Sequence, residues 1–147
     1  MKVEVRVETS CEEPKIIIVT DRVTDEINEL VQKLSGCTPQ MIVGFLQDGQ
    51  AKILDQSGIV RVFTSGGKVY AETEEGEYFM RRRLYELEER LDKGRFVRIS
   101  NSEIVNLQKV KEFDLSLAGT ICVSLANGAV TYVSRRYVAK IKRVLGI

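Results

Sequence analysis

The chain of 147 residues has no histidine, and its three cysteines, Cys11, Cys37 and Cys122, stand far apart. Without histidine the chain cannot use the commonest general base, a Cys–His dyad or most kinds of zinc site. No two cysteines form a Cys-x-x-Cys pair, so we expect buried or idle thiols rather than a redox centre.

Long apolar runs are also missing. The longest run, Ile16 to Val19, is far shorter than the roughly 20 residues of a membrane-spanning helix. No apolar signal-peptide region follows Met1. We therefore expect no membrane insertion and a cytoplasmic location. The length, and a composition of 44% hydrophobic and 29% charged residues, suit one domain with a small appendage.

Catalytic motifs are absent as well. The chain has no Gly-x-Ser-x-Gly and no Gly-x-Gly-x-x-Gly, and the Gly66-Gly67 pair is not followed by the Lys-Ser/Thr of a phosphate-binding loop. The acidic pairs Glu74-Glu75 and Glu88-Glu89 are typical of solvated turns and helix faces. We expect a protein that is not an enzyme, with no metal and no cofactor.

Charge is distributed unevenly along the chain. Residues 95–147 carry nine Lys or Arg and three Asp or Glu, a net charge of +6. The remainder therefore carries −5, because the whole chain has a net charge of +1. Such polarisation indicates a surface reserved for an anionic partner.

Residues 1–37 predict a small strand–strand–helix segment. Three valines alternate with charged residues over 3–8, and a more deeply buried strand is expected over 15–20. Asp21 or Thr24 is expected to cap a helix that ends at Gly36. With five basic and eight acidic residues, this segment is too small to bury a core of its own. We expect it to pack on the body or on a second copy, as a dimerisation element.

From residue 41 the pattern changes to short strands separated by turns. The expected strands cover residues 41–47, 50–54, 59–64, 68–74, 77–81, 96–99, 106–113, 120–124 and 130–133. Asp48-Gly49 and Asn127-Gly128 are hairpin signals, the second of them typical of a type I′ turn. A leucine-lined helix over 84–91 is expected to end at Gly94, and a C-terminal helix is expected after Ser134 as its N-cap.

The C-terminal helix begins with Ser134-Arg135-Arg136, and three more cations, Lys140, Lys142 and Arg143, follow. Cations at a helix start oppose the helix macrodipole, so stability alone would not select them. Arginine there is suited to phosphate contact or to bidentate reading of guanine. The alternative is a solvated basic face.

Ser100-Asn101-Ser102, beside Arg98, interrupts an alternating stretch. Asparagine can pair with the N6 and N7 atoms of adenine, and serine can hold a phosphate. The alternative is a turn or a helix cap. A third cluster, Arg81-Arg82-Arg83, precedes several glutamates on the same expected helix, so we interpret it as intrahelical pairing.

Two stretches resemble the LytTR DNA-binding domain family. The first runs from Leu87 to Asn106, with Leu91, Phe96, Arg98 and the Ser102-x-Ile-Val-Asn ending in the family order. The second runs from Val123 to Leu145 and contains Asn-Gly followed by Val-Ser-Arg-Arg-Tyr. The resemblance covers about residues 40–147.

The resemblance implies a mainly β, elongated fold of stacked small sheets with short helices, in which loops enter successive major grooves of duplex DNA. It places the contacts on the loop over 65–68, on the 101–102 turn and at 134–136, with Asn101 and Arg136 reading bases. Gly67 stands where some relatives have a large polar side chain, so Lys68 is expected to contact phosphate. The candidate DNA-binding residues are Lys68, Arg98, Asn101, Ser102, Ser134, Arg135, Arg136 and Lys140.

The family usually joins this domain to a phosphoacceptor receiver domain, which 37 residues cannot build. We therefore expect a stand-alone, dimeric regulator on paired direct repeats in double-stranded DNA. An inhibitory protein partner is considered in place of phosphorylation, although no residue identifies it. The alternative function is a non-enzymatic, β-rich protein–protein adaptor that binds an acidic partner.

Overall fold

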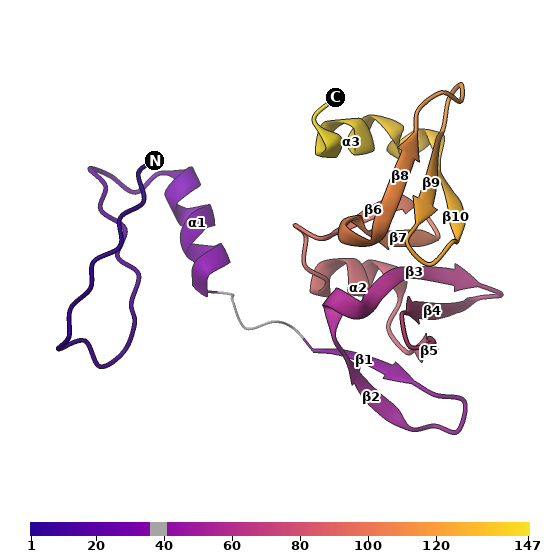
Figure 1. Cartoon of the computed structure of the whole chain (residues 1–147), viewed down its shortest axis with the longest axis horizontal. Helices are drawn as coiled ribbons and strands as arrows, with labels where there is room; N and C mark the ends of the chain where they lie inside the picture. Colours follow the sequence, from indigo (N-terminus) through magenta and orange to yellow (C-terminus); the bar gives the residue numbers. More distant parts are fainter. Residues whose placement is uncertain (36–40) are drawn as a thin grey trace. The chain divides into compact units, whose positions relative to one another are not determined.

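The computed structural model describes residues 1–35 and 41–147 and divides the chain into two compact units, Met1–Thr38 and Pro39–Ile147 (Figure 1). The expected helix stop at Gly36 and the thiol of Cys37 lie outside the described residues. In the described ranges, no helix combines the length and the apolar character that crossing a bilayer requires.

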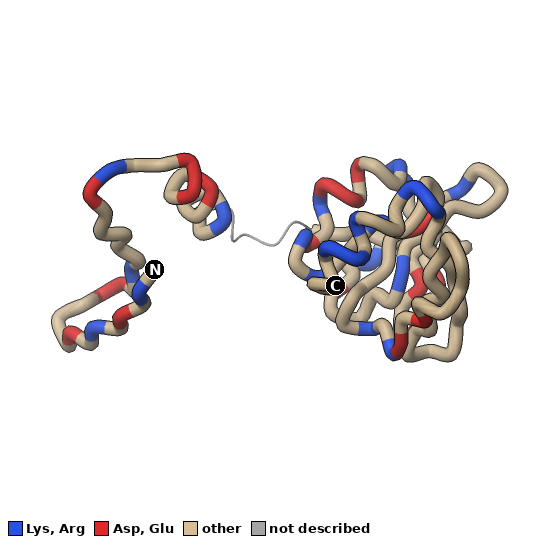
Figure 2. The backbone as a smooth tube through the Cα atoms, turned by 90° about the horizontal axis from the view of Figure 1, so that it is seen from above, with Lys and Arg blue, Asp and Glu red and all other residues tan. Residues whose placement is uncertain are grey.

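The first unit contains the helix α1 (Asp25–Ser35), which begins after Thr24 rather than after Asp21. The backbone N–H of Ile27 donates to Thr24 Oγ1 at 3.3 Å, and the N–H of Asn28 donates to the Thr24 carbonyl at 2.9 Å. Acidic residues lie in the first turn and Lys33 lies in the last, as the helix macrodipole favours (Figure 2).

The prediction of strands over 3–8 and 15–20 is wrong, because residues 1–24 contain no strand. The side chains of Val3, Val5 and Val7 are 86–88% exposed. Alternation makes a segment suitable for a half-buried strand, but two isolated strands are only marginally stable without a covered face. Within this unit the described residues provide no such cover for the three valines.

The second unit contains two antiparallel sheets, which confirms the mainly β prediction. The larger sheet has the order β2-β1-β5-β4-β3-β7-β6 and the smaller has the order β10-β9-β8. Short helices α2 (Leu84–Arg90) and α3 (Arg135–Leu145) complete the unit. The strands are β1 (Ile42–Phe45), β2 (Ala51–Leu54), β3 (Ile59–Ser65), β4 (Lys68–Thr73), β5 (Glu77–Met80), β6 (Phe96–Ser100), β7 (Glu103–Asn106), β8 (Val110–Asp114), β9 (Ile121–Leu125) and β10 (Val130–Val133).

Glycines in the left-handed region form several of the hairpin turns. Gly66 and Gly67, with φ of 57° and 77°, form the two-residue turn between β3 and β4. The turn at Asn127-Gly128 is present, but the type I′ prediction is wrong, because no described residue other than glycine has a positive φ. The Gly128 N–H donates to the Leu125 carbonyl at 3.0 Å and closes a longer, three-residue loop.

Two hydrophobic cores lie on the two sides of the β6–β7 pair. In the first core, Leu84, Leu87 and Leu91 of the α2 region pack against the larger sheet. In the second core, Ile141 of α3 packs with β9, β10 and one face of β6 and β7. Figure 1 shows the smaller sheet and α3 standing together beside β6 and β7.

The strand expected over 106–113 is confirmed only for its second half, as β8, because a 3₁₀ turn occupies Leu107–Lys109. The strand β7 ends where this prediction begins and was not predicted. All four residues of β7 are buried, so β7 lacks the alternation by which strands are recognised. The buried Asn106 side chain ends this strand. Its Nδ2 donates to the Ile59 carbonyl at 2.8 Å, and its Oδ1 accepts from the Gln108 N–H at 3.0 Å.

Replacing Asn106 by alanine should therefore lower the free energy of unfolding by about 1–3 kcal/mol, because the Ile59 carbonyl and the Gln108 N–H lose their partner. Urea denaturation followed by circular dichroism measures this change. The exposed Gln108→Ala variant is the control and should change stability little. Equal stability of Asn106→Ala and the parent chain would contradict the structural role of this amide.

Candidate nucleic-acid interface

Three turns that are distant in sequence are joined in the second unit by hydrogen bonds that the first and the third make to the region of the second. They are the β3–β4 turn at 65–68, the β6–β7 turn at 100–102 and the β10–α3 junction at 134–136. The Thr64 N–H at the base of the first turn donates to the Ser102 carbonyl at 2.8 Å. We call these three segments the turn cluster.

The third segment is bonded to the second through both backbone and side chain. The Ser134 N–H donates to the Ile99 carbonyl at 2.9 Å. The Tyr137 hydroxyl of α3 lies 3.2 Å from Asn101 Oδ1 and donates a hydrogen bond to it. Asn101 is exposed, so this bond orients the amide while leaving it accessible.

Arg98 braces the β6–β7 turn from below. Its Nε donates to the Ser100 carbonyl at 2.8 Å and its Nη2 donates to the Asn101 carbonyl at 2.6 Å. Its Nη1 lies 2.5 Å from Glu88 Oε2 on α2, and the arginine side chain is only 14% exposed. Arg98 was predicted as a DNA contact. Its guanidinium instead bonds to two backbone carbonyls and to Glu88, and these contacts hold the β6–β7 turn in place.

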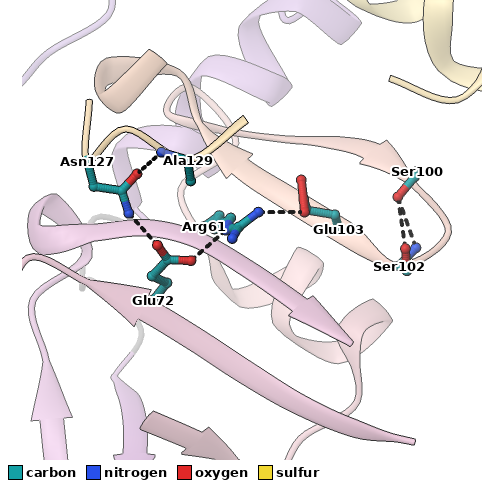
Figure 3. A network of polar contacts seen from close by, with 7 residues as sticks. All are labelled: Arg61, Glu72, Ser100, Ser102, Glu103, Asn127 and Ala129. Carbon is teal, nitrogen blue, oxygen red and sulfur yellow. Dashed lines mark hydrogen bonds and ion pairs between the residues drawn. The ribbon is translucent and has the colours of Figure 1, made fainter. Parts of the chain in front are cut away.

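Hydroxyl contacts tighten the same turn. The oxygens Ser100 Oγ and Ser102 Oγ lie 3.2 Å apart, and the Ser102 N–H donates to Ser100 Oγ at 3.2 Å (Figure 3). Ser102 itself is exposed. The turn is therefore a stiff platform for the side chains at its tip.

An open concavity of about 840 Å³ lies between the β3–β4 turn, the segment that joins β5 to α2, and the β6–β7 turn. Lys68, Arg98 and Asn101 line it together with Arg81–Arg83. The interpretation of Arg81–Arg83 as intrahelical pairing is wrong, because all three arginines precede α2. Arg82 does pair with a glutamate of that helix, at 3.5 Å from Glu86. We call this hollow the basic concavity.

The start of α3 presents the remaining predicted residues. Arg135 and Arg136 are exposed in its first turn, and this helix contains five cations and no acidic residue (Figure 2). Ser134 occupies the N-cap position as predicted, but its side chain makes no capping bond. Lys140 is half-buried, with its Nζ 6.0 Å from the centroid of the Tyr137 ring.

A part-buried polar network joins the two sheets (Figure 3). Arg61 Nε lies 2.6 Å from Glu72 Oε2, and Arg61 Nη1 lies 3.3 Å from Glu103 Oε1. The Asn127 amide, at the β9–β10 turn, donates to the other oxygen of Glu72. Because the three-stranded sheet leads into α3, this network helps to fix the start of α3 relative to the β3–β4 and β6–β7 turns.

Sequence reasoning missed several of these residues. Tyr137 carried no role, although a hydroxyl beside two exposed arginines was a usable signal. Glu88 was interpreted as part of a solvated helix face, and its pairing with Arg98 depends on a tertiary contact that no local pattern encodes. Within the described ranges, no group of three His, Cys, Asp or Glu residues is arranged to hold a metal ion.

Comparison with known proteins gives consistent matches. The family model of the LytTr DNA-binding domain matches residues 49–146. An uncharacterized HTH-type transcriptional regulator of Staphylococcus aureus strain NCTC 8325 is 30% identical, covering all of this chain and 99% of the relative. The solved LytTr DNA-binding domain of a Bacillus cereus protein is 26% identical, with a TM-score of 0.69, covering 74% of this chain and 98% of that domain.

The bracing role of Arg98 predicts a specific effect of Arg98→Lys. A lysine keeps the charge but cannot make all three contacts, so the unfolding free energy should fall by about 1–3 kcal/mol. Amide hydrogen exchange at Asn101 and Ser102 should accelerate, as NMR would detect. Arg143→Lys, on the exposed side of α3, is the control. Unchanged protection of the turn in Arg98→Lys would refute the bracing role.

Proposed function

The chain belongs to the LytTr DNA-binding domain family, and on that premise we propose that it is a transcriptional regulator that binds specific sequences in double-stranded DNA. The observation that carries the proposal is the turn cluster, in which exposed polar and cationic side chains from three distant segments share one edge. The regulator acts in the cytoplasm and performs no catalysis.

Within this proposal the side chains have different roles. Asn101 and Arg136 read base edges, since asparagine pairs with adenine and arginine with guanine in the major groove. Phosphate contacts position the protein on the duplex without reading sequence. The residues proposed for phosphate contact are Lys68, Ser102, Ser134, Arg135 and Lys140. Arg98 acts indirectly, by holding the turn that carries Asn101.

Recognition by turns fits the order of elements better than recognition by a helix-turn-helix. The name of the Staphylococcus aureus relatives refers to a helix-turn-helix. In the described residues of this chain, however, α1, α2 and α3 are separated along the chain by strands, so no two consecutive helices form that motif. We propose instead that loops from the turn cluster enter successive major grooves.

Selection from randomised duplex DNA tests the proposal. The parent chain should enrich a consensus, and Asn101→Ala and Arg136→Ala should each lose specific affinity by about 1–3 kcal/mol, roughly 5- to 150-fold. Arg143→Ala, on the same helix as Arg136, is the control. Any loss of affinity in this variant should be the same for the consensus and for other sequences. Failure of the parent chain to enrich any sequence at low salt would favour the alternative of an adaptor for an acidic protein partner.

We further propose that residues 1–37 form a dimerisation element, so that two subunits bind paired direct repeats. Val3, Val5 and Val7, and the run from Ile16, remain largely exposed in the single chain. Packing against the same segment of a second copy would cover these apolar side chains.

Light scattering at micromolar concentration should accordingly find a dimer for the full chain and a monomer after deletion of residues 1–37. A Val3→Ser, Val5→Ser, Val7→Ser variant should weaken the dimer, since it removes apolar area from the interface. A monomeric full chain would end this proposal.

A further inference from the structure

The turn cluster does not account for all the cations around the basic concavity. Arg81, Arg82 and Arg83 are exposed and line the same concavity as Lys68 and Asn101. No Asp or Glu is among the residues that line this concavity. A hollow with such a lining has a positive potential and attracts an anion.

Aromatic rings hold two of these cations in position. Arg81 Cζ lies 4.0 Å from the centroid of the Phe45 ring, and Lys68 Nζ lies 5.9 Å from that of Phe79. A cation over a ring keeps its N–H groups available for an anion while its position is restricted. The rings belong to one row of residues paired across four neighbouring strands, namely Phe45, Phe79, Tyr70 and Phe63.

Apart from the contact of Arg81 with the Phe45 ring, stability does not explain the three arginines. They precede α2, where a cation opposes the helix macrodipole. The ion pair of Arg82 with Glu86 is long, at 3.5 Å, and its side chains are 46% and 37% exposed, so it contributes little. In the described part of the chain, Arg81 and Arg83 form no ion pair.

We infer that the basic concavity receives DNA phosphates and that the Arg81–Arg83 segment is a fourth DNA-contacting element. This inference rests on the proposed function and adds contacts that raise affinity without reading sequence. A DNA strand fits better than a small anion, because the hollow is open and its rim carries Asn101, a proposed base-reading residue.

The test compares the full chain with R81Q/R82Q/R83Q on a selected duplex and on a random one, over a series of salt concentrations. Each neutralised phosphate contributes roughly 0.9 to the slope of log affinity against log salt, so the slope should fall by about 2–3. Affinity near 0.15 M salt should fall roughly tenfold or more on both duplexes alike. R81K/R82K/R83K should keep most of the slope, since it keeps the charge.

A matched control removes the same charge elsewhere. K52Q/K93Q/K111Q changes exposed or part-exposed lysines that do not line the basic concavity, and it should leave most of the slope unchanged. Thermal unfolding checks that α2 is retained, and the single variant R81Q, expected to lower the slope by about 1, remains informative if the triple variant is unstable.

The outcomes separate the two proposals. If R81Q/R82Q/R83Q is folded and its log affinity depends on log salt with the same slope as in the parent chain, the inference is overturned. The proposed function then stands, as long as the parent chain enriches a consensus. An equal loss in the control triple also overturns it, because net charge would then be the cause. A changed consensus in R81Q/R82Q/R83Q would mean base reading and would overturn the phosphate assignment. Absence of DNA binding by the parent chain defeats the proposed function itself.

Discussion

The strands β6 and β7 lie between the two hydrophobic cores, and the position of the turn cluster depends on them. Phe96 and Ile104 pack into the first core, and Val97, Ile99 and Val105 pack into the second. Because both faces of the pair are covered, a shift in its register would open one core or the other. The turn that carries Asn101 therefore projects from a strand pair that is packed on both faces, which suits a residue that must meet a base edge in one geometry.

Polar groups reinforce this arrangement where apolar packing cannot. Arg61 lies between Glu72 and Glu103, so its part-buried charge is compensated, and the Asn127 amide extends the network to the smaller sheet. The charge of Arg98, beneath the β6–β7 turn, is likewise compensated by Glu88 of α2. These internal pairs contrast with the exposed arginines at the starts of α2 and α3, where charge opposes the helix macrodipole. Such local conflicts with stability are expected at functional sites.

Much of the fold could be predicted from the sequence, and the misses have identifiable causes. Strands such as β3 and β4 were recognisable because one face is buried and a glycine turn separates them. The fully buried β7 was missed because burial on both faces removes alternation. The strands over 3–8 and 15–20 were wrongly predicted. Alternating apolar and polar residues make a segment suitable for a strand, but a strand also needs a neighbouring strand to pair with. The Asn127-Gly128 turn was located correctly, but its type depends on the conformation of Asn127, which the dipeptide alone does not settle.

The sequence by itself determined the fold class, the turn positions, the basic character of the C-terminal half and the family resemblance, because local patterning and residue order carry these properties. Only the tertiary structure decided which cations face outward and which are engaged inside. Arg98 braces the turn because α2 places Glu88 beside it, and Arg81–Arg83 join the candidate site because β5 ends next to the β3–β4 turn. Both facts depend on contacts between segments that are distant in sequence. Periodicity and composition describe only residues that are neighbours along the chain, so they could not reveal these contacts.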